Sequence, residues 1–96
     1  MIPSVSRGAE LELTDAARYY AQNGGKDLGL ALIDEFEAGV RLLCEQPELG
    51  APWRNRRRLP LRRFPFSIIY YTSADSLRVI ALAHHRRKPQ YWSARA

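Results

Sequence analysis

Two short basic segments hold most of the side chains in this chain that could bind or cleave a charged partner. Residues 54–63 contain six arginines, and residues 84–88 read His-His-Arg-Arg-Lys. Arginine forms paired hydrogen bonds with carboxylates and phosphates and stacks on aromatic rings, whereas imidazole can transfer protons near neutral pH. The segments therefore predict a surface that binds nucleic acid or an acidic peptide. The alternative is a charged strand edge and solvated face that only protect the protein from aggregation.

The residues expected to contact a partner come from both segments and from the aromatic pair that follows them. They are Arg56, Arg58, Arg62, Arg63, His84, His85, Arg86, Arg87, Tyr91 and Trp92. Because His84 and His85 end a strand, their side chains should point to opposite faces of the sheet. One imidazole could then act as a general acid or base; the alternative is that one packs and the other caps the strand end. The three cations that follow should lower the pKa of an imidazole at this place and favour its neutral form.

The two halves of the chain carry opposite charge. Residues 1–50 have four basic and nine acidic side chains, a balance of −5, whereas residues 51–96 have eleven basic and one acidic, a balance of +10. This separation creates a directional field over one end of the molecule. Such a field attracts an anionic partner, but charge alone does not distinguish nucleic acid from an acidic peptide.

Length and composition narrow the class of protein. With 96 residues, 46% hydrophobic and 26% charged, the sequence is typical of one small globular domain, expected to span residues 1–96. Neither a membrane-spanning segment nor a secretory signal is expected. The single Cys44 cannot form an internal disulfide, so a reducing cytoplasm is the expected location. One cysteine and two adjacent histidines do not favour a zinc site, and there is no Gly-rich phosphate loop, so neither a metal nor a cofactor is expected.

Two helices are expected in the first half of the chain, as part of the fold that positions the basic and aromatic residues. Ser6 suits the N-cap of a first helix with apolar side chains at three- and four-residue spacing, and Asn23-Gly24-Gly25 should end it. A longer helix follows with an apolar stripe from Leu28 to Leu43. The short Gly-rich connection predicts that the two helices form an antiparallel hairpin.

Four strands are expected around this hairpin, at residues 2–5, 58–61, 64–72 and 77–83. Proline weakens the second of them, which should be exposed on one side, and the third is apolar on both faces, as in a central strand. The order β-α-α-β-β-β predicts an α+β fold in which an antiparallel sheet carries the helix hairpin on one face. Tyr91 and Trp92 either fold back onto the sheet as a lid or remain available to a partner, and the cations around them favour exposure.

Several segments together resemble the RelE/ParE toxin superfamily, and the resemblance covers nearly the whole chain. They are the helix hairpin, Gln46-Pro47-Glu48-Leu49-Gly50, Arg63-Phe64-Pro65-Phe66-Ser67-Ile68-Ile69-Tyr70, and the ending His84…Arg87…Pro89…Tyr91-Trp92. The resemblance implies the toxin half of a bacterial type II toxin–antitoxin pair. The partner would be an acidic antitoxin, encoded alongside, with a DNA-binding region and a tail that wraps the toxin in a hetero-oligomer.

The superfamily contains two activities. RelE-like members cut messenger RNA in the ribosomal A site with basic residues and an aromatic or histidine acid–base group, whereas ParE-like members inhibit DNA gyrase. Ser67 stands where RelE-like enzymes usually carry an arginine, which favours the ParE-like branch. The first alternative is a RelE-like ribosome-dependent endoribonuclease, for which Arg63, His84 and Arg87 are the candidate catalytic residues. The second is a basic domain that binds nucleic acid without toxicity.

Overall fold

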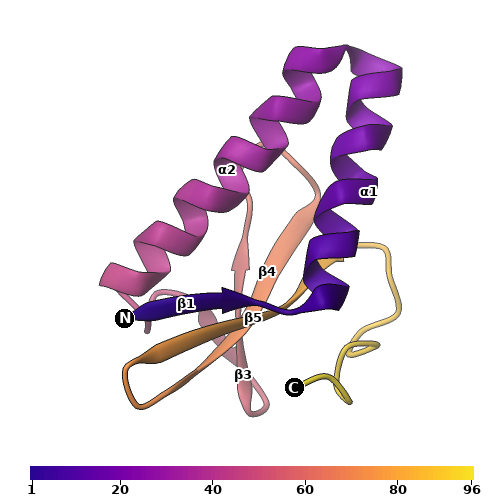
Figure 1. Ribbon diagram of the computed structural model, residues 1–96. Coiled ribbons are helices and arrows are strands. Elements are labelled where there is room, and N and C mark those ends of the chain that lie inside the picture. The colour runs from indigo at the N-terminus through magenta and orange to yellow at the C-terminus, as the bar shows by residue number, and fades with distance from the viewer.

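A computed structural model describes residues 1–96 as two helices and one five-stranded sheet (Figure 1). The elements are β1 (Ile2–Val5), α1 (Arg7–Gly24), α2 (Lys26–Glu45), β2 (Ala51–Trp53), β3 (Arg56–Pro60), β4 (Phe66–Ser73) and β5 (Ser76–His84). In the sheet the strand order is β1-β5-β4-β3-β2. The predicted α+β fold with the helix hairpin on one face of the sheet is confirmed.

The sheet differs from the expectation in two respects. β1 pairs with β5 in parallel, with Ile2 opposite Ser76 and Val5 opposite Val79, so the sheet is mixed, although every other pair is antiparallel. The three-residue β2 is an additional strand beside β3, too short to show a periodicity in the sequence. The edges of the sheet are therefore β1 and β2, and the proline-containing β3 is an inner strand.

The helix hairpin begins and turns where its capping residues predict. The Ser6 hydroxyl accepts a hydrogen bond from the Ala9 N–H at 3.1 Å, which satisfies one of the free donors of the first turn of α1. α1 ends before Gly25, which has a φ of 97°. Glycine adopts this conformation without the steric cost that a Cβ would add. The chain can therefore reverse within one residue and start α2.

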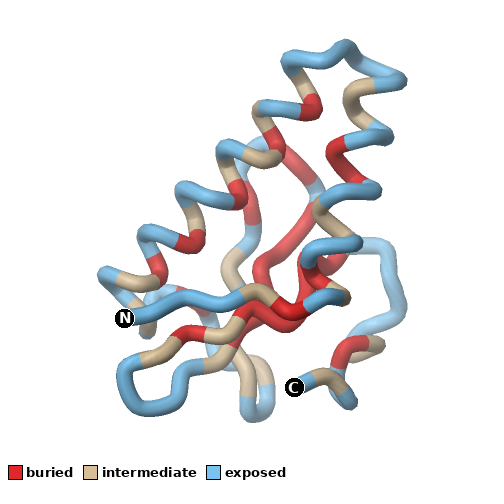
Figure 2. Tube along the Cα trace, in the orientation of Figure 1, coloured by how far each residue is buried: buried red, intermediate tan, exposed pale blue.

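Hydrophobic side chains pack on both faces of the sheet, and Figure 2 shows the buried segments concentrated in β4 and β5. On the helix face, side chains of α2 such as Leu32 and Phe36 pack with Ile68 and Tyr70 of β4. The opposite face, which we call the outer face, has a smaller core: Ile69, Ile80, Ala81, Ala83 and Trp92. The two cores explain why β4 is apolar on both faces.

A bulge in β5 determines which face each later residue occupies. Ile69 lies opposite Ala81 and Tyr70 lies opposite Val79, which leaves Ile80 without a partner on β4. One extra residue reverses the alternation of side chains along a strand. Val79 before the bulge and Leu82 after it consequently both face the helices. The bulge thereby sets the faces of the histidines that end the strand.

Candidate functional site

A cavity of about 230 Å³ lies on the outer face, where β4 begins and β5 ends. Side chains of the sheet and residues 88–92 of the C-terminal segment enclose it. Its lining consists of Trp53, Arg58, Ser67, Ile69, Ala83, His84, His85, Arg87, Lys88, Pro89, Gln90, Tyr91 and Trp92. We call it the cationic cavity, because its walls contain two arginines and a lysine but neither aspartate nor glutamate. Its charge and shape suit a small anionic group of a partner.

His85 faces the outer side of the sheet. Its ring is exposed, and Nε2 lies 2.9 Å from the hydroxyl of Ser67, a buried side chain at the base of the cationic cavity. None of the residues that line the cavity is a carboxylate, so this Ser–His pair lacks the third group that orients the histidine of a catalytic triad. The arrangement is better suited to donating hydrogen bonds than to activating the serine.

His84 lies on the helix face, as the bulge requires. Its ring packs edge-on against Phe66 with the ring centres 4.9 Å apart, and Nδ1 accepts the Arg86 N–H at 3.0 Å. Burial lowers the pKa of His84, and its electrostatic interactions with the neighbouring Arg86 and His85 lower it further. The imidazole is therefore neutral near pH 7. The predicted placement of the two histidines on opposite faces is confirmed.

The arginines predicted as partner contacts occupy three different settings. Arg58 and Arg87 line the cationic cavity, with the Arg58 guanidinium 5.0 Å from the Trp53 ring centre and that of Arg87 3.8 Å from the Tyr91 ring centre. Arg56 instead packs over Tyr71 and donates to the Arg95 carbonyl at 3.2 Å. The remaining three, Arg62, Arg63 and Arg86, are exposed.

The exposed arginines lie at the same end of the sheet as the histidines. Phe66 at the start of β4 is opposite His84 at the end of β5, and the His85 N–H donates to the Pro65 carbonyl at 2.9 Å. Glu35 of α2 holds the connection between β3 and β4 here, since its Oε2 accepts the backbone N–H groups of Arg62 and Arg63. The backbone of this connection is thus anchored while both guanidiniums are exposed.

Trp92 corrects one expectation about the C-terminal segment. Only 2% of its surface is exposed, and it packs edge-on against Trp53 with the ring centres 5.4 Å apart. The ring folds back because the outer face of β4 and β5 would otherwise expose Ile69 and Ile80 to water, and burying that area outweighs the cationic surroundings. Trp92 is therefore a lid rather than a surface contact. Tyr91 is half-buried, and its hydroxyl donates to Glu12 of α1.

A wider groove of about 520 Å³ lies on the helix side of the cationic cavity. Its lining is Glu12, Asp15, Ala16, Tyr19, Tyr20, Phe66, Leu82, His84, Arg87 and Tyr91, and we call it the aromatic groove. The two hollows share His84, Arg87 and Tyr91. Tyr19 is 60% exposed, which is unusual for a large aromatic side chain and leaves apolar surface open to solvent.

The structure brings in two carboxylates, Glu12 and Glu35, that are not among the residues expected from the sequence to contact a partner. Glu12 and Glu35 both lie in the line of an apolar stripe, Glu12 beside Ala9, Leu13 and Ala16, and Glu35 beside Leu32 and Phe36. Each of these glutamates stands three residues after one apolar residue of its stripe and one residue before the next. The period of the helix therefore places its side chain on the buried side. That spacing was the available signal, and each carboxylate accepts backbone N–H groups of the sheet or of its connections.

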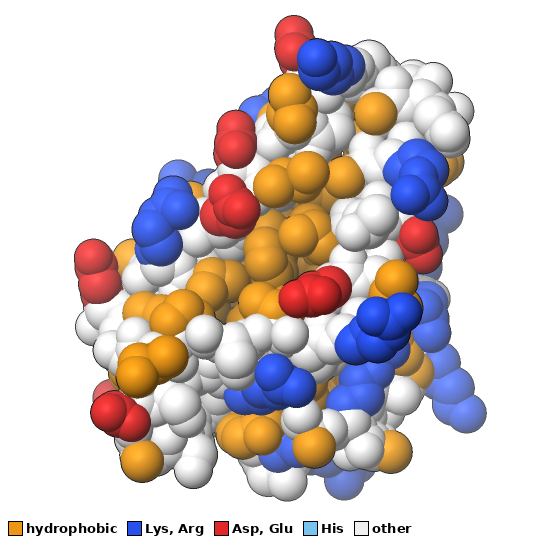
Figure 3. Space-filling view, viewed as in Figure 1, with side chains coloured by type: hydrophobic (Ala, Val, Ile, Leu, Met, Phe, Trp, Pro, Cys, Tyr) orange, Lys and Arg blue, Asp and Glu red, His pale blue; other side chains and the backbone are white.

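Charge and hydrophobicity are distributed unevenly over the surface in Figure 3. Hydrophobic side chains are visible in the angle between α1 and α2, and Lys and Arg side chains gather at the lower right of the view, towards the C-terminal segment. Neither helix is long and apolar enough to cross a membrane.

Comparisons with known proteins agree with this architecture. The structure is similar to a chain of the solved chromosomal ParDE TA system from P. aeruginosa, with a TM-score of 0.76 and 19% identity, covering 88% of this chain and 95% of that one. At that identity the likeness is one of fold. No curated protein sequence matches closely enough to count as a relative. Residues 4–89 match the model of the family described as the ParE toxin of type II toxin–antitoxin system, parDE. Because this match covers most of the chain, the protein belongs to the ParE toxin family.

Proposed function

We propose that this ParE-family protein arrests bacterial growth by inhibiting DNA gyrase and that a cognate antitoxin neutralises it by direct binding in the cytoplasm. The chemistry of the cationic cavity is the observation that favours gyrase inhibition over RNA cleavage. It contains several groups that bind an anion, Arg58, His85, Arg87 and Lys88, whereas two candidate acid–base groups in its lining are already engaged: His84 packs on Phe66 and the Tyr91 hydroxyl donates to Glu12. Inhibition of an enzyme by binding needs the first kind of group and not the second.

The candidate acid–base groups support binding rather than RNA cleavage. Cleavage requires a group that accepts a proton and one that donates a proton at the reacting atoms. The Tyr91 hydroxyl already donates to Glu12, and burial together with that carboxylate raises the pKa of Tyr91, so it does not act as a base near pH 7. The ring of His84 is packed on Phe66. Ser67 stands in the place where RelE-like members carry an arginine.

Gyrase inhibition is tested by adding the purified protein to a DNA supercoiling assay and, in parallel, by measuring mRNA integrity after induction in cells. We expect loss of supercoiling with intact mRNA. His84→Ala and His85→Ala should each retain substantial toxicity, whereas the double variant Arg62→Ala/Arg63→Ala should weaken it, because charge at this end steers and holds the target. Circular dichroism of each variant controls for folding. Unchanged supercoiling at growth-arresting levels of the protein would refute gyrase as the target.

A ribosome-dependent endoribonuclease is the second candidate. The observation that favours it is the 2.9 Å contact between His85 and Ser67 in a cavity that also contains Arg58 and Arg87. In that case mRNA would be cut within coding regions after induction. Replacing one histidine would then abolish all activity in a folded protein.

Neutralisation is proposed to involve an acidic, partly apolar segment of the antitoxin. The exposed Arg62, Arg63 and Arg86 lie at the end of the sheet where Phe66 and His84 line the aromatic groove, so charged and apolar groups are available at one end of the molecule. Tails that fold on binding commonly use such surfaces. Co-expression with the neighbouring gene should restore growth and yield a stable complex. If the isolated chain is harmless and nothing co-purifies with it, the proposed toxin–antitoxin pair is wrong.

A further inference from the structure

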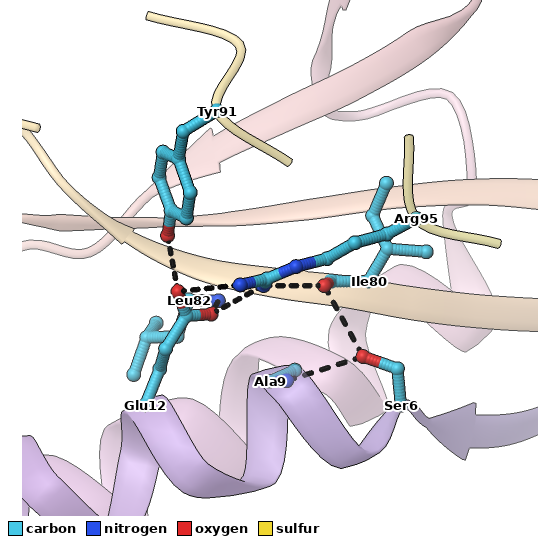
Figure 4. A network of polar contacts seen from close by, with 7 residues as sticks. All are labelled: Ser6, Ala9, Glu12, Ile80, Leu82, Tyr91 and Arg95. Carbon is cyan, nitrogen blue, oxygen red and sulfur yellow. Dashed lines mark hydrogen bonds and ion pairs between the residues drawn. The ribbon is translucent and has the colours of Figure 1, made fainter. Parts of the chain in front are cut away.

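One carboxylate connects α1, β5 and the C-terminal segment (Figure 4). Oε1 of Glu12 accepts the Leu82 N–H at 3.0 Å and a guanidinium N–H of Arg95 at 2.9 Å. Its Oε2 accepts the Tyr91 hydroxyl and a second Arg95 N–H at 3.3 Å. Only 16% of the Glu12 side chain is exposed, so these bonds form largely out of water, where they are stronger than surface contacts.

The same network completes the hydrogen bonds of the bulge in β5. β1 pairs with β5 only as far as Val79, so beyond that residue no strand lies on this side of β5. There the Ile80 carbonyl accepts the Ser6 hydroxyl at 3.1 Å and Arg95 at 3.0 Å, and Glu12 accepts the Leu82 N–H. The side chains of Ser6, Glu12 and Arg95 thus take the place of a neighbouring strand. They hold the bulge that determines which face His84 takes and which face His85 takes.

Tyr91 extends the network to the cationic cavity. Its hydroxyl is tied to Glu12, which restricts rotation of the ring, and the Arg87 guanidinium lies 3.8 Å from the centre of that ring. A guanidinium at this distance is attracted to the face of the ring. Arg87 is otherwise exposed and has no ion pair within the chain, so the Tyr91 ring is the surface that orients it.

We propose that Glu12 is a positioning residue of the cationic cavity: by holding Tyr91 and Arg95 it fixes the guanidinium of Arg87 in the orientation that meets the target. This role rests on the proposed function in one respect, because it requires that Arg87 contacts the target. Glu12 itself is covered by the groups it binds. Its effect on the target therefore passes through Arg87.

A double-mutant cycle separates positioning from stability. Glu12→Gln keeps the size of the side chain but removes the charge that pairs with Arg95, and Arg87→Ala removes the group that is positioned. We expect each single variant to inhibit growth and supercoiling roughly tenfold less, and the double variant to be no worse than Arg87→Ala. Glu10→Gln, an exposed carboxylate on the same helix, is the matched control and should behave as the unmodified protein. Losses that multiply in the double variant would overturn the proposal, because a structural role of Glu12 acts regardless of Arg87.

A second measurement does not depend on toxicity. Tyrosinate absorbance is followed as the pH is raised in the unmodified protein, Glu12→Gln and Tyr91→Phe. Glu12 contributes to raising the pKa of Tyr91, so in the Glu12→Gln variant the Tyr91 phenol should ionise at a lower pH than in the unmodified protein. The combined variant Glu12→Gln/Tyr91→Phe should not show this additional ionisation. A Glu12→Gln titration identical to that of the unmodified protein would overturn the proposal. If the titration changes while the unmodified protein neither arrests growth nor inhibits gyrase, the proposed function fails and the link between Glu12 and Tyr91 stands.

Discussion

At the scale of single residues, the environment of His84 makes the stability of the fold depend on pH. The folded protein lowers the pKa of His84 below the ordinary value of 6.5, mainly through burial. Below that value the unfolded chain binds a proton that the folded protein resists, so the free energy of unfolding falls as the pH drops through 6.5 towards the folded pKa. Protonation at Nδ1 would also remove the acceptor for the Arg86 N–H.

His84→Gln should therefore lose less stability on acidification than the unmodified protein does. Denaturant unfolding at several pH values between about 5 and 8.5 measures the difference, which should grow below about pH 6.5 and stay constant above about pH 7.5. A constant difference across the whole range would mean that His84 does not contribute to the pH dependence.

Tyr70 gives a second prediction at this scale. It is fully buried, its hydroxyl donates to the Pro47 carbonyl at 2.7 Å, and it accepts the Gly50 N–H at 3.0 Å. Tyr70→Phe leaves both backbone groups without a partner and should lower the free energy of unfolding by about 1–3 kcal/mol. The neighbouring Tyr71→Phe removes the same atom from a half-buried ring whose hydroxyl makes no hydrogen bond within the chain, and should have little effect. Equal losses in the two variants would contradict the role given to the Tyr70 hydroxyl.

At the scale of elements, the C-terminal segment acts as a second, small layer on the outer face of the sheet. Trp92 fills the space over Ile69, Ile80 and Ala83, so Trp92→Ala should lower the free energy of unfolding by about 3–5 kcal/mol. Ser93→Ala, at an exposed position beside it, is the control. Urea unfolding followed by circular dichroism measures both. A Trp92→Ala protein as stable as the control would indicate that the segment does not contribute to the core in solution.

Much of the arrangement of elements could be predicted from the sequence, because it depends on local signals. The Ser6 cap, the Gly25 turn and the apolar stripes fix the helices, and the double-sided hydrophobicity of residues 64–72 identifies an inner strand. The existence of β2 could not be predicted because three residues are too few to show an alternation. The parallel direction of β1 could not be predicted, because the alternation of apolar and polar residues indicates a strand but not its partner or its direction. The bulge at Ile80 was hidden for the same reason.

The sequence predicted which residues belong to the candidate site better than it predicted how they are arranged. Arg62 and Arg63 do lie at the end of the sheet where His84 ends β5, but Arg56 packs near the other end of β3 and contacts the C-terminal segment, and Trp92 is buried. Which of two adjacent histidines borders Ser67 depends on the bulge, and the inward turn of Glu12 depends on the donors that the sheet presents. The bulge and the donors of the sheet are long-range properties that no local pattern contains, although the spacing of Glu12 within the apolar stripe does place it on the buried side of α1.

At the scale of the whole molecule, the separation of charge predicts how a partner arrives. The charges of the second half would attract the acidic antitoxin proposed above, over a distance that salt shortens. Raising the ionic strength from about 0.05 to about 0.5 M should slow association with the product of the neighbouring gene roughly tenfold or more, with a smaller change in the dissociation rate. Stopped-flow mixing measures both rates. Arg62→Gln/Arg63→Gln should show a shallower salt dependence, and an association rate indifferent to salt would contradict this prediction.

The parallel pairing of β1 with β5 has a consequence for the synthesis of the chain. Within the sheet, β1 (Ile2–Val5) is synthesised before the other four strands and has β5 as its only neighbour, so it must wait until residues 76–79 have been made. At about 5–20 residues per second that wait lasts several seconds, during which the local contacts of the helix hairpin can already form. The cationic end is completed only when β5 joins the sheet. A nascent chain that stops before β5 can therefore form local contacts of the helix hairpin but has none of the assembled surface through which the protein would act.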